Sequence, residues 1–395
     1  MQFDLVFEGG GAKGMVFVGA LQELERRGHT FGRLLGTSAG AIMATFTAAG
    51  FSVDEMLAAL SEKDDNGVPV FQQFLGQPRP FTPDEVANSV TREILRQIDL
   101  RLLPNFIEDR LDNLVLRLMT QEELINMFSF VERGGWYSAD AFVNWAMAKL
   151  DQTSPEGLER NLSEKTFAEF HQITGRELSL VAADITGQRM LVLNRRTAPQ
   201  LPVVWGMRMS MSLPLLWQEV LWKREWGTYL NNPMEGHRIV DGGILSNFPI
   251  ELFLSNAPHV LSIMGSRTGK SVLGLLIDES LKVTGVQDTV ARSGGLVDLS
   301  PVARITGLID TAAHAHDKMV IEAFEQFVCR LPAKSYRTTE FDMTDERRRL
   351  LIAAGRSAID DYFRNRETEG MKGPNVFEME KALKRADGIA LNILQ

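Results

Sequence analysis

The sequence predicts an α/β protein in which helices cover a mostly parallel sheet. Two successive stretches predict this class. Residues 3–7 form an apolar strand, which a Gly-rich loop (8–14) and a helix over about 15–27 follow directly. Residues 31–35 form a second short strand, and a buried helix over 39–49 comes after it. Because strands that alternate with helices usually lie parallel in one sheet, we expect this arrangement to continue along the chain.

Composition is that of an ordinary globular protein, with 44% hydrophobic and 24% charged residues among 395. A single large domain with insertions fits this length as well as two or three domains. The net charge of −9 argues against a nucleic-acid partner and gives no help in docking to anionic membranes. No apolar run approaches the roughly 18 residues of a transmembrane helix, and no signal peptide is recognisable. The single cysteine, Cys329, suits a reducing compartment, so we expect a cytoplasmic protein.

The second strand is followed by a candidate nucleophile. Ser38 lies between Gly36 and Gly40 in the pattern G-x-S-x-G, at the turn from strand to helix. Such a turn exposes the serine hydroxyl at the carboxyl end of a sheet, and the glycines permit its tight backbone. The helix N-terminus beneath it favours developing negative charge. The five-residue pattern is weak alone, since a plain Gly/Ser turn fits it equally well.

The Gly-rich loop after the first strand also satisfies G-x-G-x-x-G over residues 9–14. A dinucleotide site would need an acidic residue at the end of the second strand, and residues 34–36 offer none. A phosphate-binding loop would need Gly-Lys followed directly by Ser or Thr, and this chain has Lys13-Gly14-Met15. What fits best is a nest of free backbone N–H groups at a helix N-terminus, suited to an oxyanion, with a nucleotide site a distant second.

A serine nucleophile needs a base, and the sequence offers an acid rather than a histidine. Asp241 ends a strand over 238–241, and Gly242 and Gly243 permit an abrupt turn after it. A desolvated carboxylate within hydrogen-bond reach can serve as the base directly. No histidine stands in a context that marks it as the partner, and this holds for His29, His171, His237, His259, His314 and His316. We therefore favour a Ser–Asp dyad of Ser38 and Asp241.

The rest of the chain is assigned more coarsely. Residues 51–135 contain few patterns typical of strands, and we expect them to form a helical cap or lid. Spacing predicts a further helix over 344–362, with Thr344 as N-cap and Arg347, Arg348 and Arg349 on its solvated side. The last 30 residues are expected to fray or to pack against a second subunit. Other predicted elements are helices over 86–98, 107–128, 141–150, 208–214 and 309–327, buried strands over 178–183, 190–194 and 260–264, and a partly mobile stretch over 266–300.

Three elements in this order resemble the patatin-like phospholipase family: residues 9–14, the turn 36–40 and the acid with its two glycines, 241–243. The resemblance extends through residues 181–186, 210–214, 243–249 and 339–343. It implies a three-layer α/β/α sandwich, with Ser38 as acyl-enzyme nucleophile and Asp241 as base. It also implies an oxyanion hole at Gly9, Gly10, Gly11 and Lys13, in which the amides of Gly10 and Gly11 donate and Lys13 gives support. Neither a metal nor another cofactor is expected.

The predicted organisation is a catalytic domain over 1–365 that contains a helical insertion over 51–135, followed by a C-terminal extension over 366–395. The predicted function is a serine-dependent lipid acyl hydrolase that cleaves fatty acyl esters of membrane phospholipids and is peripheral at the membrane surface when active. We leave open a homodimer, an activating ligand or partner, and a role as a regulated toxin or defence effector. The alternatives are a soluble carboxylesterase or thioesterase, and a catalytically silent lipid-binding or scaffold protein.

Overall fold

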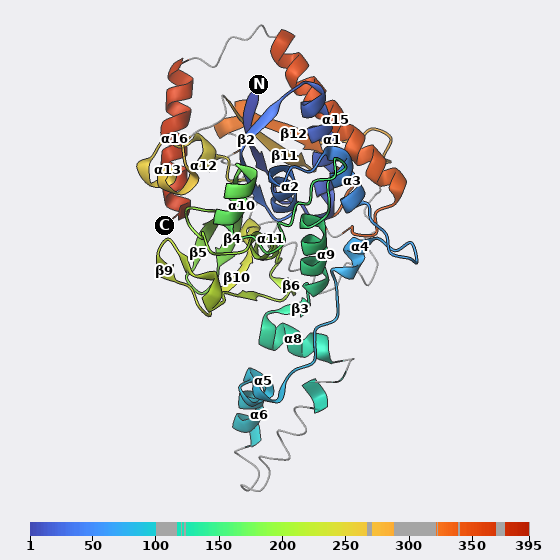
Figure 1. Ribbon diagram of the computed structural model, residues 1–395, viewed down its shortest axis with the longest axis vertical. Coiled ribbons are helices and arrows are strands. Elements are labelled where there is room, and N and C mark those ends of the chain that lie inside the picture. The colour runs from blue at the N-terminus through green and yellow to red at the C-terminus, as the bar shows by residue number, and fades with distance from the viewer. Residues whose placement is uncertain are drawn as a thin grey trace.

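A central sheet organises the computed structural model of this chain (Figure 1). The model describes residues 1–99, 117–119, 121, 124–266, 271–287, 321, 323–338, 340–368 and 376–394. Eight strands pair in the order β12-β11-β1-β2-β4-β10-β7, and β5 pairs with β4. The neighbours from β12 to β4 are parallel, whereas β5, β10 and β7 pair antiparallel. The prediction of a mostly parallel sheet is confirmed. The strands are β1 (Gln2–Phe7), β2 (Thr30–Thr37), β4 (Glu177–Asp184), β5 (Arg189–Leu193), β7 (Val220–Leu221), β10 (Arg238–Asp241), β11 (Ser271–Asp278) and β12 (Val328–Pro332).

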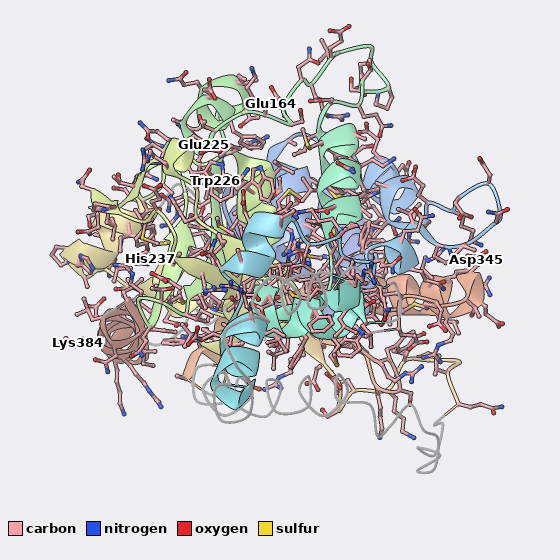
Figure 2. The ribbon with its side chains drawn as sticks, turned by 90° about the horizontal axis from the view of Figure 1, so that it is seen from below. Glu164, Glu225, Trp226, His237, Asp345 and Lys384 are labelled. Atoms are coloured by element: carbon pink, nitrogen blue, oxygen red, sulfur yellow. The ribbon has the colours of Figure 1, made fainter. Side chains whose placement is uncertain are left out.

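Both faces of the sheet are buried, so its strands carry apolar side chains on both sides. In β1, Phe3, Leu5 and Phe7 point into one core, and Val6 points into the other. This alternation follows from the two-residue repeat of a strand. Helices cover each core, which gives the three layers of an α/β/α sandwich. Figure 2 shows Asp345 and Lys384, from helices of the two different layers, on opposite sides of the molecule.

The first core lies under a layer of helices formed by both ends of the chain. Helix α1 packs along α15, and a Cβ on Gly19 would lie only 1.8 Å from the carbonyl oxygen of Ile352. Glycine therefore lets the two backbones approach closely. The prediction of Thr344 as N-cap of α15 is supported, because its hydroxyl accepts the N–H of Arg347 at 3.3 Å. The helices of this layer are α1 (Val16–Arg26), α2 (Ala39–Ala48), α3 (Val53–Leu60), α9 (Asp140–Leu150), α10 (Phe167–Thr174), α11 (Val203–Ser210) and α15 (Asp345–Thr368).

The second core is covered by α12 (Glu251–Leu254), α13 (Pro258–Met264) and α16 (Val376–Leu394). The prediction of a strand over 260–264 was wrong, because Pro258 begins a helix there and its buried residues follow helical spacing. The last 30 residues were expected to fray or to pack on a second subunit, but residues 376–394 among them form a helix. Helix α16 packs on α12 of the same chain, where Asp387 accepts the hydroxyl of Ser255 at 2.7 Å.

The stretch 266–300 was predicted to be partly mobile, but residues Ser271–Asp278 form β11, an inner strand between β1 and β12. The Gly, Ser and Thr residues that surround this apolar run obscured it. The predicted helix over 309–327, with His314 and His316, falls mostly outside the described residues. Cys329 lies in β12, and burial raises its pKa to about 12. The cysteine is a core residue, with 2% exposure.

Two further predicted helices differ in extent. The helix expected over 208–214 ends at Ser210 and begins upstream as α11. The helix expected over 86–98 is two helices, α5 (Pro83–Ala87) and α6 (Val90–Asp99). Of the helix expected over 107–128, residues 107–116 lie outside the described residues, and α8 begins at Ile125.

Helices α5, α6 and α8 (Ile125–Arg133) form an arm that extends away from the sheet (Figure 1). Strand β3 (Gly135–Tyr137) joins the arm to the body by pairing with β6 (Leu215–Trp217). No described helix is both long and apolar enough to cross a membrane. The remaining elements are α4 (Val70–Gln73), β8 (Thr228–Tyr229), β9 (Asn232–Pro233) and the 3-10 turns η1 (Gly11–Met15), η2 (Arg224–Trp226), η3 (Gly242–Ile244) and η5 (Glu325–Phe327).

Two ion clusters stiffen the sheet. Asp4 of β1 accepts both the backbone N–H and the Nε of Arg33 at 2.8 Å, and both side chains are buried. On β4, Glu177 contacts Arg195 and Arg196. Burial alone would raise the pKa of Glu177, but the hydrogen bonds from the two guanidinium groups outweigh it and lower the pKa to about 2.

Candidate active site

Ser38 lies at a strained turn between β2 and α2. Its backbone angles are φ 52° and ψ −122°, in a region that residues other than glycine rarely adopt. The turn is tight, since a Cβ on Gly36 would lie 2.2 Å from the carbonyl oxygen of Gly40, and one on Gly40 would lie 2.3 Å from that of Phe7. The glycines of G-x-S-x-G are therefore required by close backbone contact. Ser38 itself retains 7% exposure.

A neighbouring serine holds this turn. The backbone N–H of Ser38 donates to Oγ of Ser210 at 3.0 Å, and the Ser210 hydroxyl donates to the carbonyl oxygen of Val181 at 2.6 Å. Ser210 ends α11 and is fully buried. It thus connects the turn to the adjacent strand β4. The sequence marked Ser210 only as part of a block shared with the family and gave it no role.

Asp241 is the last residue of β10 and is fully buried. One of its carboxylate oxygens accepts the N–H of Gly243 at 2.8 Å, which fixes the orientation of the group. Gly242 begins the 3-10 turn η3 that leads the chain away from the strand. Ser38 and Asp241, more than two hundred residues apart, line one cavity.

The Gly-rich loop lines the same cavity through Gly9, Gly10, Gly11 and Lys13. The N–H of Gly9 donates to the carbonyl oxygen of Asn247 at 3.2 Å, and that of Lys13 donates to the carbonyl of Gly10 at 3.1 Å. Within the described part of the chain, the amides of Gly10 and Gly11 have no backbone acceptor. These two donors are the ones that the sequence assigned to an oxyanion. Because β1 and β2 are neighbours, this loop and the Ser38 turn meet at one edge of the sheet.

The loop is held in place by residues that the sequence did not single out. The side-chain amide of Asn247 donates to the carbonyl oxygen of Gly9 at 2.8 Å and to Glu8 at 3.3 Å. Glu8 in turn accepts the N–H of Ile277 at 2.5 Å, and so connects the loop to β11. Asn247 follows the Asp-Gly-Gly turn by four residues, so one segment carries both the acid and this support.

The charge of Lys13 is shared with Glu279, with which it forms an ion pair inside the cavity. Lys13 is 6% exposed, whereas Glu279 is 49% exposed. The expected role of Lys13 in supporting an oxyanion therefore stays a prediction, and a second charge that the sequence did not mark lies beside it.

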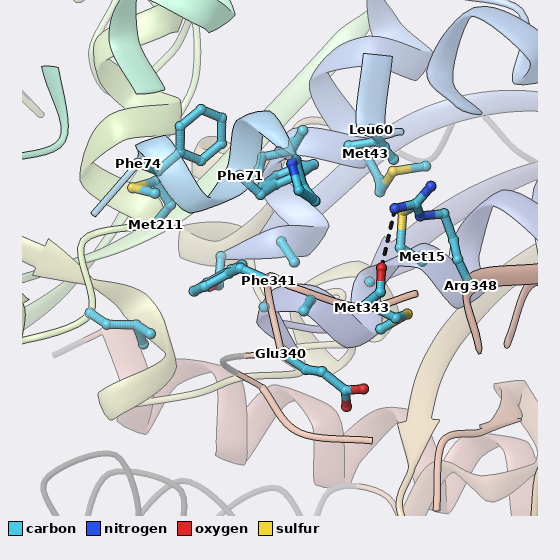
Figure 3. A pocket seen from close by; sticks show the side chains of 18 of the residues that line it. Met15, Met43, Leu60, Phe71, Phe74, Met211, Glu340, Phe341, Met343 and Arg348 are labelled. Atoms are coloured by element: carbon cyan, nitrogen blue, oxygen red, sulfur yellow. Dashed lines mark hydrogen bonds between the residues drawn. The ribbon is translucent and has the colours of Figure 1, made fainter. Parts of the chain in front are cut away.

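Ser38 also borders a second, mostly apolar cavity of about 830 Å³, part of it open to solvent. Figure 3 shows its wall, in which Phe341 lies near Phe71 of α4. Phe341 stacks on Phe71 with ring centroids 6.5 Å apart and meets Trp217 at 6.1 Å. The wall further includes Met15, Ile42, Met43, Leu60, Phe74, Met211, Leu213 and Met343. The serine hydroxyl thus lies where an apolar cavity and a polar cavity meet.

One charged residue of this wall corrects a prediction. Arg348 was expected on the solvated side of its helix, but it is 9% exposed and lines the apolar cavity. It donates to Asp345 at 2.9 Å and to the carbonyl oxygen of Met343 at 3.4 Å, the bond drawn in Figure 3. Arg347 is paired with Glu340 at 2.6 Å. The first turn of α15 faces the cavity, which a count of charges along the helix does not reveal.

The residues that line the polar cavity include no histidine. His237 instead contacts Asp184, with Nδ1 2.9 Å from the carboxylate. His314 and His316 lie outside the described residues. Nor does any cluster of three or more His, Cys, Asp or Glu in the described ranges present a metal site.

Comparisons with known proteins place this arrangement in a family. Residues 5–254, more than half of the chain, match the family model "Patatin-like phospholipase". The Bacillus subtilis protein YqhO, itself uncharacterised, is 26% identical over 366 residues and covers 90% of this chain and 96% of its own. The mimivirus protein R571 is 24% identical over 66% of this chain and 64% of its own.

Two solved structures are also similar. The structure of VipD from Legionella pneumophila shares 17% identity over 92% of this chain and 67% of its own, with a TM-score of 0.44. The type III effector ExoU of Pseudomonas aeruginosa shares 18% identity with a TM-score of 0.40, and this chain spans about half (53%) of it. The family model, by contrast, covers more than half of the chain. This chain belongs to the patatin-like phospholipase family.

Proposed function

We propose that this chain is a serine-dependent lipid acyl hydrolase that cleaves fatty acyl esters of membrane phospholipids through a Ser38–Asp241 dyad. One observation carries the proposal. Ser38 stands between an apolar cavity suited to an acyl chain and a polar cavity that contains Asp241 and the amides of Gly10 and Gly11. An ester bound across this boundary would have its acyl chain on one side and its alcohol on the other.

The chemistry follows from these positions. Oγ of Ser38 attacks the ester carbonyl carbon and passes its proton to Asp241. The carbonyl oxygen becomes an oxyanion, which the N–H groups of Gly10 and Gly11 stabilise with the positive charge of Lys13 nearby. The ester C–O bond then breaks, and Asp241 returns the proton to the leaving alcohol. Water attacks the acyl-enzyme with Asp241 again as base, and the fatty acid is released.

The setting of Asp241 fits this assignment of the base. Its carboxylate is fully buried and lines the cavity that Ser38 also lines. The N–H of Gly243 holds one carboxylate oxygen, which keeps the group in a fixed orientation. No histidine is required by this scheme, in agreement with the residues that line the cavity.

The proposal includes the place of action. The substrate is a lipid at a membrane surface, which a cytoplasmic protein approaches from the water and binds peripherally. A homodimer, an activating ligand or partner, and a role as toxin or defence effector remain parts of this hypothesis. An activator would be recognised by hydrolysis that starts only when cell extract is added.

Fluorophosphonate labelling and lipid hydrolysis test the proposal together. The wild-type protein should label at Ser38 and release fatty acid from phospholipids in mixed micelles. Ser38→Ala and Asp241→Asn should each abolish hydrolysis with little change in thermal stability. Ser163→Ala and Asp151→Asn are matched controls outside both cavities and should retain activity.

Three outcomes would contradict the proposal. A wild-type protein that neither labels nor hydrolyses any ester would support the catalytically silent alternative. Activity confined to soluble esters would support the carboxylesterase or thioesterase. Near-normal turnover by Asp241→Asn would show that another group is the base.

A further inference from the structure

The two charges of the ion pair in the polar cavity differ in their exposure to solvent. Lys13 comes from the Gly-rich turn η1 beside Ser38, and its side chain is 6% exposed. Glu279 follows the end of β11 at the mouth of the cavity, and its side chain is 49% exposed. The positive charge of this pair is therefore the buried one, and the negative charge is the one nearer to solvent.

The same order of opposite charges occurs in a zwitterionic phospholipid. Outward from its ester group the lipid carries an anionic phosphate and then a cationic amine. The ammonium of Lys13 has three N–H donors, so it can bind a phosphate oxygen and still face Glu279. The carboxylate of Glu279, being half-exposed, is accessible to the lipid amine beyond it.

The rest of the cavity strengthens this preference. Glu8 and Asp241 add two carboxylates to its wall, so that three carboxylates and the ammonium of Lys13 line the cavity. One carboxylate oxygen of Glu8 accepts from the side-chain amide of Asn247 and the other accepts the N–H of Ile277 in β11, which holds that charge in place. A headgroup that brings a phosphate without a cation would add negative charge to a cavity already lined by three carboxylates, and like charges repel.

We propose that the Lys13–Glu279 pair is the headgroup-binding element of this site, and that Glu279 selects zwitterionic phospholipids over anionic ones. The inference rests on the proposed function, because it assigns the polar cavity to the leaving alcohol. Lys13 binds the phosphate, and Glu279 binds the amine. In the absence of lipid, the two residues neutralise each other.

An internal competition tests this selection. Dioleoyl phosphatidylethanolamine and dioleoyl phosphatidylglycerol, which differ in the headgroup cation, are mixed in equal amounts in micelles of a neutral detergent. Mass spectrometry of the two lysophospholipids gives the ratio of the two values of kcat/KM. Both lipids share one micelle, so surface binding and the amount of active enzyme cancel from the ratio.

The wild-type protein should favour the ethanolamine lipid. Glu279→Gln should lower the preference about fivefold, the size expected of one half-exposed charge pair, and Glu279→Lys should lower it further or reverse it. Glu235→Gln is the matched control, because Glu235 forms an exposed ion pair with Arg224 and lines neither cavity. Its ratio should equal that of the wild type.

The two hypotheses fail in different ways. If the wild-type protein hydrolyses neither lipid nor a soluble ester such as p-nitrophenyl butyrate, the proposed function is wrong. If it hydrolyses the lipids, but both Glu279 variants keep the wild-type ratio, then Glu279 does not select the headgroup and the inference is overturned.

Discussion

Replacing Ser210 with alanine should damage both the stability and the turnover of this protein. The substitution leaves two buried groups without their partner, the N–H of Ser38 and the carbonyl oxygen of Val181. Each unsatisfied buried group costs about 1–3 kcal/mol, and Ser210 is fully buried. We therefore expect the free energy of unfolding to fall by about 3 kcal/mol, measured by urea denaturation.

The effect on catalysis follows from the strained backbone of Ser38, whose conformation costs on the order of 1–3 kcal/mol. Loss of the bond from its N–H lets the turn relax, and about 1.4 kcal/mol of relaxation corresponds to a tenfold loss in the population of the active geometry. We expect kcat for p-nitrophenyl butyrate to fall about tenfold with KM unchanged, at a temperature where the variant is fully folded.

Thr45→Val is the matched control. Thr45 is as deeply buried as Ser210 and donates its hydroxyl to the carbonyl oxygen of Ala41 at 2.8 Å, within the helix that begins beside Ser38. It makes no contact with the Ser38 turn itself. The control should lose about 1 kcal/mol of stability and keep its kcat. If Ser210→Ala matches Thr45→Val in both measurements, the turn does not depend on Ser210 and our argument is wrong.

Three further predictions follow. Phe341→Ala removes an aromatic wall of the apolar cavity, so kcat/KM for a p-nitrophenyl ester of a long acyl chain should fall about tenfold relative to the butyrate, and an unchanged ratio would refute an acyl-binding role. Asp4→Asn leaves the buried guanidinium of Arg33 without its counter-charge. It should lower the free energy of unfolding, measured in urea, by about 3–5 kcal/mol, and a loss under about 1 kcal/mol would contradict this prediction. Because the folded pKa of Glu177 is depressed to about 2, its stabilisation is complete above the unfolded pKa near 4.5 and is lost as the pH falls from there toward 2. The stability difference between wild type and Glu177→Gln should accordingly shrink over that pH range, and a constant difference would contradict the assignment.

The fold class could be predicted because its signals are local. The strand, loop and helix at 3–27 and the turn at Ser38 each occupy a few dozen residues. Where the same run of apolar residues fits two structures, the prediction failed. The apolar run over residues 260–264 is short, buried and partly β-branched. Only the proline before it distinguishes a helix from a strand. Strand β11 was missed because Gly, Ser and Thr residues surround its apolar run, and its pairing with the distant strand β1 leaves no local mark.

The residues of the site were predicted with unequal success for the same reason, because only local signals can be recognised in a sequence. Ser38, Asp241 and the glycines are marked by tight turns, which demand particular residues at fixed spacing. Ser210 and Asn247 form hydrogen bonds to distant backbone, and Glu279 forms an ion pair with Lys13 because β11 pairs with β1. Such residues carry no spacing signal, so the structure is needed to find them.

The order of strands in the sheet determines which truncations of the chain would remove part of the sheet. The family model ends at residue 254, yet β11 and β12 lie beyond that point and β11 pairs directly with β1. A fragment that stopped there would leave β1 as an open edge and would also lack Phe341 and Glu279 from the walls of the two cavities. The segment that matches the family model therefore lacks two strands of the central sheet, and a chain cut at residue 254 should be less stable than the whole chain.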